Sequence, residues 1–540
     1  MRRLVLIATA AASIPIAVCA IRAVADRWVP LGDTAYTAVN ALDVFSGHTP
    51  LVGQWSSGAT AAVDQPAYSP GPLLFWLLAI PARLPEASLM IVTIAIVNVA
   101  SVAGALALAR RRGGLGLMLA VAIAIPLMLA SLPGEVHADI WNSSAPLLPL
   151  VLLVFLAWSL AAGEYRLLPL TALVASFLVQ SHLTFAAPAV GVTAVGLIGL
   201  VLTRRPPLPW VLAALAVLLV CWSAPLVEQA KERPGNLVLL GRAAFADEPT
   251  AGIDTGWHAV VRTVGVRPWW LQDPDDPVQR ARQLRGDPGA LATLTAVLVL
   301  AGLVAAAIAG WRRRRFDVLT AAALALVLCG ALAQVAASTP TATYDTLGYT
   351  LRWSSPAGMF VWLALGWAAV ELLAGARLPR PRDGRRAVAS ALVATTAAGI
   401  VVSAVAVPRR DPYAQMRTIG DQLKAELPAR GSVRVDARIN RQTIFLAFML
   451  QAGAVYSLRS DGRDVVAPSI AIGMGKHYNR ESATRRIRVE VGHPFGSGRT
   501  LVSVLTPDPF VEFGHREWPV VVKQAGSWRY LRSPSERPGR

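Results

Sequence analysis

Apolar residues recur along this chain in long blocks, most of them close to twenty residues in length. A helix needs about 20 apolar residues to cross a hydrocarbon core of about 30 Å, so most blocks are long enough to span a membrane. Only 16% of the 540 residues are charged, whereas an ordinary soluble domain has about 25%. These features exclude a single soluble domain, a disordered chain and a small disulfide scaffold, and they indicate a polytopic membrane protein.

The apolar blocks predict a mainly α-helical bundle of about eleven transmembrane helices. The fifth is short and would need residues from its flanks. The expected spans are Leu4–Ala25, Ala87–Ala109, Leu115–Ser131, Ala145–Ala162, Leu167–Val179, Phe185–Leu202, Leu208–Val227, Gly289–Trp311, Val318–Ala337, Ser354–Ala374 and Ala387–Val407.

The distribution of Lys and Arg predicts the orientation of these spans. If the N-terminus is cytoplasmic, every second junction should be basic. Arginines fill those junctions, at positions 110–112, 166, 204–205, 312–315 and 377–386, whereas the alternate short loops contain only Arg352. We therefore expect a multi-pass plasma-membrane protein with a cytoplasmic N-terminus and an extracytoplasmic C-terminal domain. Much of the formal charge of +18 then marks the inner face, and we expect no nucleic-acid partner.

The N-terminal block has a second interpretation. Its two arginines, apolar run and Ala23-Val24-Ala25 sequence resemble a signal peptide with a cleavage site. The run is long for a signal peptide and Arg22 interrupts the cleavage region, so we favour a retained first span.

Three segments on the outer side are too long to be simple connectors. They are Asp26–Glu86, Glu228–Pro288 and the residues after Pro408. We expect two domains, a transmembrane catalytic domain over residues 1–407 and an extracytoplasmic α/β domain over residues 408–540. In the latter, patterning predicts helices at Tyr413–Leu427 and Gln442–Gln451 and strands at Ser432–Asp436, Thr500–Leu505 and Trp518–Lys523.

Common motifs of soluble enzymes are absent from the sequence, including the phosphate-binding glycine loops, the G-x-S-x-G elbow and the H-E-x-x-H helix. Asp273-Pro-Asp275-Asp276 contains a D-x-D pattern, but its prolines favour a turn. Trp518, Trp528 and Tyr530 could stack on sugars, although core packing is the simpler role.

Polar groups concentrate in the predicted outer loops. Asp33 follows the first span, and the run Thr34–Val44 could form a helix capped by Asp33, with Tyr36, Val39, Asn40 and Asp43 at helical spacing. Three short loops contribute further groups, namely Glu135, His137, Asp139, Trp141 and Asn142, then Gln180 and His182, then Asp345, Tyr349 and Arg352. Each has a plain alternative as a helix cap or solvated loop residue. Ionisable groups converging on one face of a membrane protein nevertheless predict a functional site.

Three motifs together resemble the GT-C glycosyltransferase superfamily. They are an Asp in the first outer loop (Asp33), the Tyr68-Ser-Pro-Gly-Pro-Leu73 segment before a short juxtamembrane helix, and the Gln180-Ser-His182-Leu-Thr184 tip. Members are multi-span enzymes that transfer sugars from polyprenyl phosphates on the outer face. The composition and soluble tail look most like the actinobacterial mannosyl- and arabinofuranosyltransferase-like members, with motif detail confined to roughly the first 200 residues.

The resemblance implies an inverting glycosyltransferase of cell-envelope biogenesis, with a polyprenyl-phosphate sugar as donor and an envelope glycan or glycolipid as acceptor. It implies that Asp33 is catalytic and accepts the proton of the acceptor hydroxyl. Asp139 matches an acidic position that assists or binds a divalent cation, Mg²⁺ or Mn²⁺, together with Asp33. Donor or acceptor binding is expected from Tyr36, Tyr68, His137, Gln180, His182, Tyr349 and Arg352, with Arg352 at the lipid phosphate.

Two departures from the family pattern leave parts of this picture open. The family's Lys-Pro-Pro variant is Ser69-Pro-Gly-Pro72 here, which removes a cation. Its Asp-Glu pair is Asp33-Thr34, so metal dependence stays open. The alternatives to an enzyme are a transporter or lipid flippase, and a non-catalytic envelope assembly protein.

Overall fold

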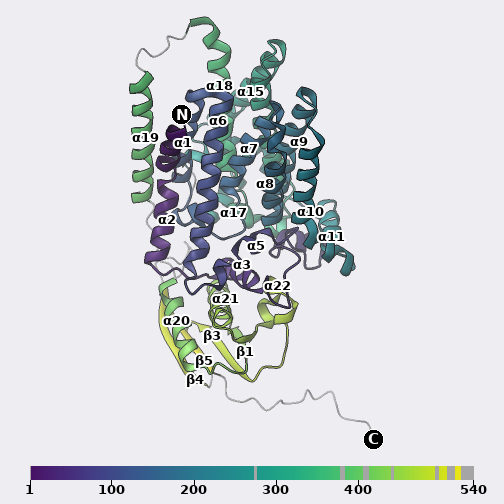
Figure 1. Ribbon diagram of the computed structural model, residues 1–540. Coiled ribbons are helices and arrows are strands. Elements are labelled where there is room, and N and C mark those ends of the chain that lie inside the picture. Colours follow the sequence, from purple (N-terminus) through teal and green to yellow (C-terminus); the bar gives the residue numbers. More distant parts are fainter. Residues whose placement is uncertain are drawn as a thin grey trace. The chain divides into compact units, whose positions relative to one another are not determined.

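The computed structural model describes residues 2–272, 276–377, 384–405, 413–438, 443–492, 498–507 and 517–524. It is mainly helical, with a small sheet near the C-terminus (Figure 1). The described residues form two compact units. The first is drawn from Met1–Ala25, Pro50–Leu77 and Ser88–Pro408, and the second from Asp26–Thr49, Leu78–Ala87 and Arg409–Arg540. The second unit therefore contains more than the C-terminal domain expected from residue 408 onward.

The first unit consists of long apolar helices and short helices in the junctions between them. Its α-helices are α1 (Arg2–Ala12), α2 (Ile14–Ala25), α4 (Ser57–Val63), α6 (Ser88–Ala130), α7 (Leu147–Ala161), α8 (Leu168–Ser181), α9 (Ala186–Thr203), α10 (Leu208–Lys231), α11 (Asn236–Ala244), α12 (Gly252–Val264), α13 (Trp269–Gln272), α14 (Pro277–Arg285), α15 (Ala290–Arg312), α16 (Phe316–Ala337), α17 (Leu347–Thr350), α18 (Ser354–Arg377) and α19 (Gly384–Val405). Its 3₁₀ turns are η2 (Gly134–Ala138), η3 (Tyr165–Leu167), η4 (Leu183–Phe185) and η5 (Thr341–Thr346). The short helix α5 (Leu73–Leu78) follows the Tyr68–Pro72 segment.

Seven helices in the described part of the chain are long and apolar enough to cross a membrane. They include α6, α10, α15 and α16, together with segments of α18 and α19 and the η4–α9 helix. The pair α1 and α2, bent by 54°, would make an eighth span. The chain thus has the helices of a membrane-embedded protein. The number of eleven spans stays a prediction, because α7 and α8 are shorter than a full span and α6 merges two expected spans.

The helix α6 contains two segments joined at a sharp break. Gly113 and Gly114 leave the helical region, and Gly114 has a φ of +68°. The side chain of Asn98, in the first segment, donates to the carbonyl of His137 at 2.9 Å. In a straight helix Asn98 and Ala130 would be about 48 Å apart at 1.5 Å per residue, which is too far for this contact. The chain therefore turns back at the two glycines.

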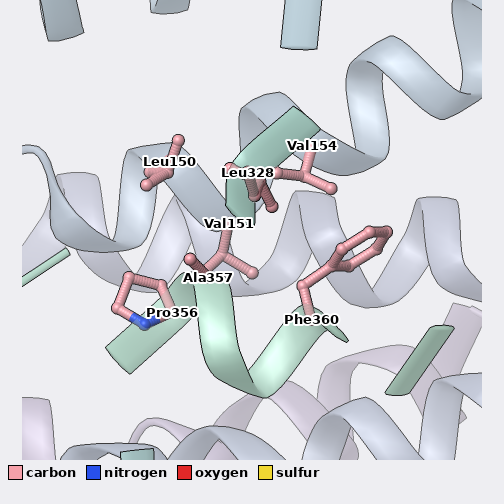
Figure 2. A pocket seen from close by; sticks show the side chains of 7 residues that line it. All are labelled: Leu150, Val151, Val154, Leu328, Pro356, Ala357 and Phe360. Carbon is pink, nitrogen blue, oxygen red and sulfur yellow. The ribbon is translucent and has the colours of Figure 1, made fainter. Parts of the chain in front are cut away.

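The helix α7 lies at the centre of the first unit. Every residue from Leu147 to Ala161 is buried, and α7 packs against α6, α8, α9, α16 and α18. Figure 1 shows α6, α7, α8 and α9 running side by side. Figure 2 shows the apolar contact among α7, α16 and α18, where side chains such as Val151, Leu328 and Phe360 line a small pocket.

Glycines on α9 allow its close approach to α7. A Cβ added at Gly196 would lie 2.8 Å from the Cα of Ala157, and one added at Gly199 would lie 2.4 Å from the Cβ of Ala161. Both distances are well below ordinary contact, so these two positions require glycine.

The second unit has a five-stranded sheet in the order β2-β1-β3-β5-β4. Strands β1 and β2, and β1 and β3, are parallel, whereas β5 is antiparallel to both β3 and β4. The helices α20 and α21 pack against the sheet and each other, and α3 packs against α21. The bounds are α3 (Gly32–Asp43), η1 (Pro81–Arg83), α20 (Tyr413–Glu426), β1 (Ser432–Arg438), α21 (Ile444–Ser460), β2 (Asp464–Val466), η6 (Pro468–Ile470), α22 (Ala471–Met474), η7 (Lys476–Tyr478), β3 (Arg485–Val491), β4 (Arg499–Pro507) and β5 (Glu517–Gln524).

The expected elements of this unit are confirmed where the structure describes them. The strands β1, β4 and β5 and the helix α20 lie at the predicted positions. The helix α21 extends to Ser460, nine residues beyond the predicted end at Gln451. Strand β3 was not predicted, because its alternating arginines gave it a polar character.

The close contact between α9 and α7 generates a first prediction. The substitution Gly196→Val would push α9 away from Ala157 and lower the free energy of unfolding by about 1–3 kcal/mol, the usual cost of overpacking. The measurement is the thermal unfolding midpoint of the purified protein in lipid nanodiscs. Gly330→Val is the matched control, because no atom lies within 4 Å of a Cβ at this exposed position of α16. Equal midpoints for the two variants would contradict the packing argument.

Candidate functional site

Basic junctions of the first unit meet through ion pairs at one end of the helices. Arg111 and Arg112, at the α6 break, pair with Glu164 in the junction between α7 and α8. Arg112 also lies 3.6 Å from Asp317, at the start of α16. The sequence assigned these three junctions to the same side, and their contacts agree with that grouping.

The alternate junctions of the first unit also contact one another. The ring of Trp141, before α7, lies 4.8 Å from the ring of Tyr349, before α18. The hydroxyl of Thr184, between α8 and α9, donates to the carbonyl of Thr350 at 3.2 Å. Most of the site residues expected from the sequence lie in these junctions.

An acidic and a basic side chain are coupled here through a serine. Asp139 Oδ1 accepts the backbone N–H of Trp141 at 3.0 Å, and the carboxylate also binds the Ser144 hydroxyl. Arg352 Nη1 donates to Ser144 Oγ at 3.4 Å, and its guanidinium carbon lies 5.2 Å from the Trp141 ring centre. We call Asp139, Trp141, Ser144, Tyr349 and Arg352 the Asp139–Arg352 site.

Burial makes Asp139 a proton acceptor suited to near-neutral pH. Loss of solvent raises the pKa of its carboxyl to about 6, and the charge of Glu135 adds to the increase. The hydrogen bond from Trp141 and the positive charge of Arg352 act in the opposite direction. A carboxyl with a pKa near 6 is ionised at pH 7 and still basic enough to take a proton from a reacting hydroxyl.

A second buried arginine, Arg280, binds residues on both sides of Arg352 in the sequence. Arg280 of α14 is 2% exposed and donates to the Leu351 carbonyl at 3.1 Å and the Ser354 hydroxyl at 2.6 Å. Its guanidinium also stacks on Trp269 at 4.3 Å. Sequence reasoning missed Arg280, because an arginine in a short polar helix resembles any solvated residue. Since Arg352 is itself only 7% exposed, its described contacts favour an effect on Asp139 over open binding of a lipid phosphate.

His182 lies against the same loop. Its Nδ1 is 2.9 Å from the Thr184 hydroxyl, which in turn contacts the Thr350 carbonyl. Burial lowers the pKa of His182 to about 4, so the imidazole is neutral at pH 7. Thr184 therefore connects His182 to the loop that contains Tyr349 and Arg352, and binding of donor or acceptor by His182 stays a prediction.

Gln180 links the other two predicted motifs. Its Nε2 donates to the Cys221 carbonyl at 2.8 Å, and a Cβ at Gly71 would lie 2.2 Å from its Oε1. The Tyr68–Pro72 segment therefore packs directly on Gln180. The backbone of Tyr68 is held by Asn236, whose side chain accepts the Tyr68 N–H at 2.9 Å and donates to the Tyr68 carbonyl at 3.0 Å. These contacts position the two segments, and ligand binding by Gln180 and Tyr68 stays a prediction.

His137 makes contacts typical of a structural residue. It is 2% exposed, and its Nε2 lies 2.8 Å from the Leu129 carbonyl at the end of α6. Burial also lowers its pKa, so the ring is neutral. This geometry favours a role in fastening the loop before Asp139, and binding of donor or acceptor by His137 stays a prediction.

Asp33 belongs to the second unit and does not cap its helix, so that expectation was wrong. The helix α3 begins at Gly32, and Thr34 Oγ1 accepts the Leu31 N–H at 2.9 Å while donating to the Leu31 carbonyl at 2.8 Å. Asp33 is exposed in the first turn, where the helix dipole favours a carboxylate. Its charge adds to burial in raising the pKa of Tyr36.

The predicted face of α3 is a packing surface inside the second unit. A Cβ at Gly473 would lie 3.2 Å from the Tyr36 ring, and Asn40 Nδ2 donates to the Gly473 carbonyl at 2.9 Å. The ring of Tyr36, expected to bind a donor or acceptor, therefore packs against α22.

A buried ionic cluster completes the same face. Asp43, whose side chain is fully buried, accepts from Arg459 at 2.7 Å and from the Tyr478 hydroxyl at 3.0 Å, and lies 3.1 Å from His477 Nε2. Burial alone would raise the pKa of Asp43, but His477 and Arg459 together hold it below its ordinary value. The sequence analysis noted Asp43 only for its spacing from Tyr36 and Asn40. Its partners lie more than 400 residues away and carried no indication of the contact.

The described residues do not form a conventional metal site. No group of three or more His, Cys, Asp or Glu side chains in the described ranges is arranged to hold a metal ion. Asp139 has one acidic neighbour, Glu135, and its other contacts are the Trp141 amide, Ser144 and Arg352. These partners suit an ionised carboxylate, so no step is assigned to Mg²⁺ or Mn²⁺ here.

Two of the remaining residues singled out in the sequence have structural roles, and the others lie outside the described residues. Asp276, the only described residue of the D-x-D segment, accepts the N–H of Val278 at 3.0 Å and caps α14. Trp518 is 7% exposed in β5, which fits core packing. Asp273, Asp275, Trp528 and Tyr530 lie outside the described residues.

Comparison with known proteins gives no family assignment, because no known family model and no curated protein matches the chain.

The raised pKa of Asp139 predicts how stability depends on pH. An unfolded Asp titrates near pH 4, but Asp139 in the folded protein titrates at about 6. Stability therefore falls as pH rises from about 4 through 6, because the folded state retains a proton that the unfolded state has released. Asp139→Asn, whose side chain can still accept the Trp141 N–H, should lose this component of the pH dependence. Unfolding midpoints between pH 4 and 8 would show the difference, with exposed Asp247→Asn as control; parallel curves for the wild type and Asp139→Asn would contradict it.

Proposed function

We propose that this chain is an inverting glycosyltransferase. It transfers a sugar from a polyprenyl-phosphate donor to an acceptor on the outer face of the plasma membrane. The observation that carries the proposal is the Asp139–Arg352 site: a carboxyl with a raised pKa, coupled to a buried arginine, beside two aromatic rings. An ionised carboxylate can accept a hydroxyl proton, and aromatic faces suit the C–H faces of sugars. The apolar helices support a donor with a lipid tail.

The proposed topology follows the sequence prediction. It has eleven spans in the plasma membrane, a cytoplasmic N-terminus and the Asp139–Arg352 site on the outer side. The acceptor is an envelope glycan or glycolipid. A mannosyl or arabinofuranosyl donor follows from the resemblance alone.

The proposed transfer requires one group on the protein that accepts a proton. The acceptor hydroxyl oxygen attacks the anomeric carbon from the side opposite the phosphate, a new glycosidic bond forms and the bond to polyprenyl phosphate breaks. Polyprenyl phosphate leaves with the bonding electron pair, and the hydroxyl proton passes to the carboxylate. Within the first unit Asp139 fits this role, whereas the resemblance assigns it to Asp33.

Transfer of labelled sugar by the purified full chain tests the proposal. The donors are polyprenyl-phosphate mannose and polyprenyl-phosphate arabinofuranose, and short envelope-type oligosaccharides are the acceptors. If Asp139 is the base, Asp139→Asn should lower kcat about 10²–10⁴-fold, the usual range for a general base. Asp247→Asn should match the wild type.

Asp33→Asn, measured in parallel, separates the two candidate bases. Loss of transfer only in Asp33→Asn would move the catalytic role to Asp33. Full activity in both variants would remove both assignments, and no turnover with either donor would favour a transporter, flippase or assembly protein.

A separate prediction concerns Arg352 as a positioning residue. Its charge lowers the pKa of Asp139, so Arg352→Gln should move the rising limb of kcat/KM against pH toward higher pH. Arg352→Lys should restore part of the shift because it keeps the charge. An unchanged pH profile with a raised donor KM would instead indicate that Arg352 binds the lipid phosphate.

A further inference from the structure

A second pocket lies in the first unit, apart from the residues of the Asp139–Arg352 site. It has a volume of about 300 Å³ and is bounded by α12, α14 and η5. Its polar lining includes Asp254, Thr255, His258, Arg285, Thr341 and Tyr344. This volume is at the lower end of the range for small-molecule sites, and it suits a sugar ring better than a large cofactor.

The two basic side chains of the pocket are already partnered. Arg285 Nη2 lies 2.9 Å from Asp345 Oδ1, and its guanidinium stacks on the Tyr344 ring at 4.3 Å. His258 Nδ1 lies 2.9 Å from the Leu284 carbonyl, which can only accept, so this nitrogen carries the hydrogen. The pocket therefore offers no uncompensated cation for a phosphate or carboxylate ligand.

The acidic side chain differs from the basic ones. Asp254, in the first turn of α12, has no ion-pair partner among the described residues. A carboxylate together with threonine and tyrosine hydroxyls and an imidazole supplies hydrogen-bond acceptors and donors within one small space. Neutral hydroxyl groups satisfy such a set, whereas an anion would be repelled by Asp254.

The pocket shares a wall with the proposed catalytic loop. Tyr344 and Asp345 precede Tyr349 and Arg352 in the same junction, between α16 and α18. The helix α14 contacts both parts, through Arg285 to Asp345 and through Arg280 to the Leu351 carbonyl. A ligand in the pocket would thus be held by the segment that also positions Arg352.

We propose that this pocket binds a neutral sugar unit of the acceptor glycan, at a distance from the hydroxyl that reacts. The assignment of the sugar to the acceptor rests on the proposed function; sugar binding itself does not require transfer. Asp254 accepts hydrogen bonds from sugar hydroxyls, and Tyr344 and Leu284 border the ring.

The test measures sugar binding before any transfer is assayed. The full chain in nanodiscs is titrated with short linear mannopyranosyl and arabinofuranosyl oligosaccharides, and binding is followed by calorimetry. Asp254→Asn should weaken binding about tenfold, the size expected when a charged hydrogen-bond acceptor is lost. Ala251→Trp should abolish binding, because the larger side chain would fill the pocket. The fold should tolerate this substitution, because the backbone N–H of residue 251 can still donate to the Thr339 carbonyl, as it does at 2.8 Å in the wild type.

Two control variants separate an effect on the pocket from a general effect of each substitution. Asp247→Asn and Ala342→Trp make the same changes at exposed positions that do not line the pocket, and they should bind as the wild type does. Wild-type thermal midpoints in all four variants would show that the fold is intact. Absence of sugar binding by the wild type, or binding unchanged in Asp254→Asn and Ala251→Trp, would overturn the proposal.

Transfer assays then distinguish the two proposals. If both hold, the pocket variants raise the acceptor KM and leave kcat and the donor KM unchanged. Transfer with an unaltered acceptor KM would reject the pocket and keep the enzyme. Pocket-dependent sugar binding without transfer from any donor would reject the enzyme and keep a glycan-binding site.

Discussion

The complete burial of α7 is the constraint on which the first unit depends. A helix with no exposed residue must contact neighbours on all sides, and its neighbours must approach closely enough to leave no space. Glycines on α9 and the aromatic cluster of Phe155, Trp158 and Phe360 meet this requirement in different ways. A short helix is sufficient here, because protein and not lipid surrounds it.

Rigid packing of α7 has a direct effect on the proposed site. Asp139, Trp141 and Ser144 lie in the loop that leads into α7, and that loop is fastened by the buried His137. Arg352 lies just before α18, which packs against α7. A half-buried carboxylate and a buried arginine are therefore positioned near each other by segments that adjoin the packed helices α7 and α18, which is the arrangement expected of a preorganised site.

The sequence predicted the long apolar helices well, but it did not predict every helix boundary or side-chain contact. Long apolar blocks identified most of the spanning helices, because hydropathy over about twenty residues is a strong indication. The shortness of α7 and the turn within α6 depend on tertiary contacts, such as that between Gly113 and Trp367, which no local pattern contains. Loop alternation placed the junction of Arg111 and Arg112 on the same side as the junction that contains Glu164, and the ion pairs agree. The contacts of Arg280 and Asp43, by contrast, are made with partners distant in the sequence.

The Asp43 cluster ties the folding of the second unit to the order of synthesis. His477 follows Asp43 by 434 residues, so the helices of the first unit from α4 to α19 are translated between the two. Until Arg459, His477 and Tyr478 emerge, the α3 carboxylate has none of the partners that stabilise its burial. The ionic cluster around Asp43 can therefore be completed only after the helices α4 to α19 have been translated. A chain that ends before residue 459 would keep the contact of α3 with η1 but would leave the Asp43 carboxylate without Arg459, His477 and Tyr478, and burial of a carboxylate without partners is costly.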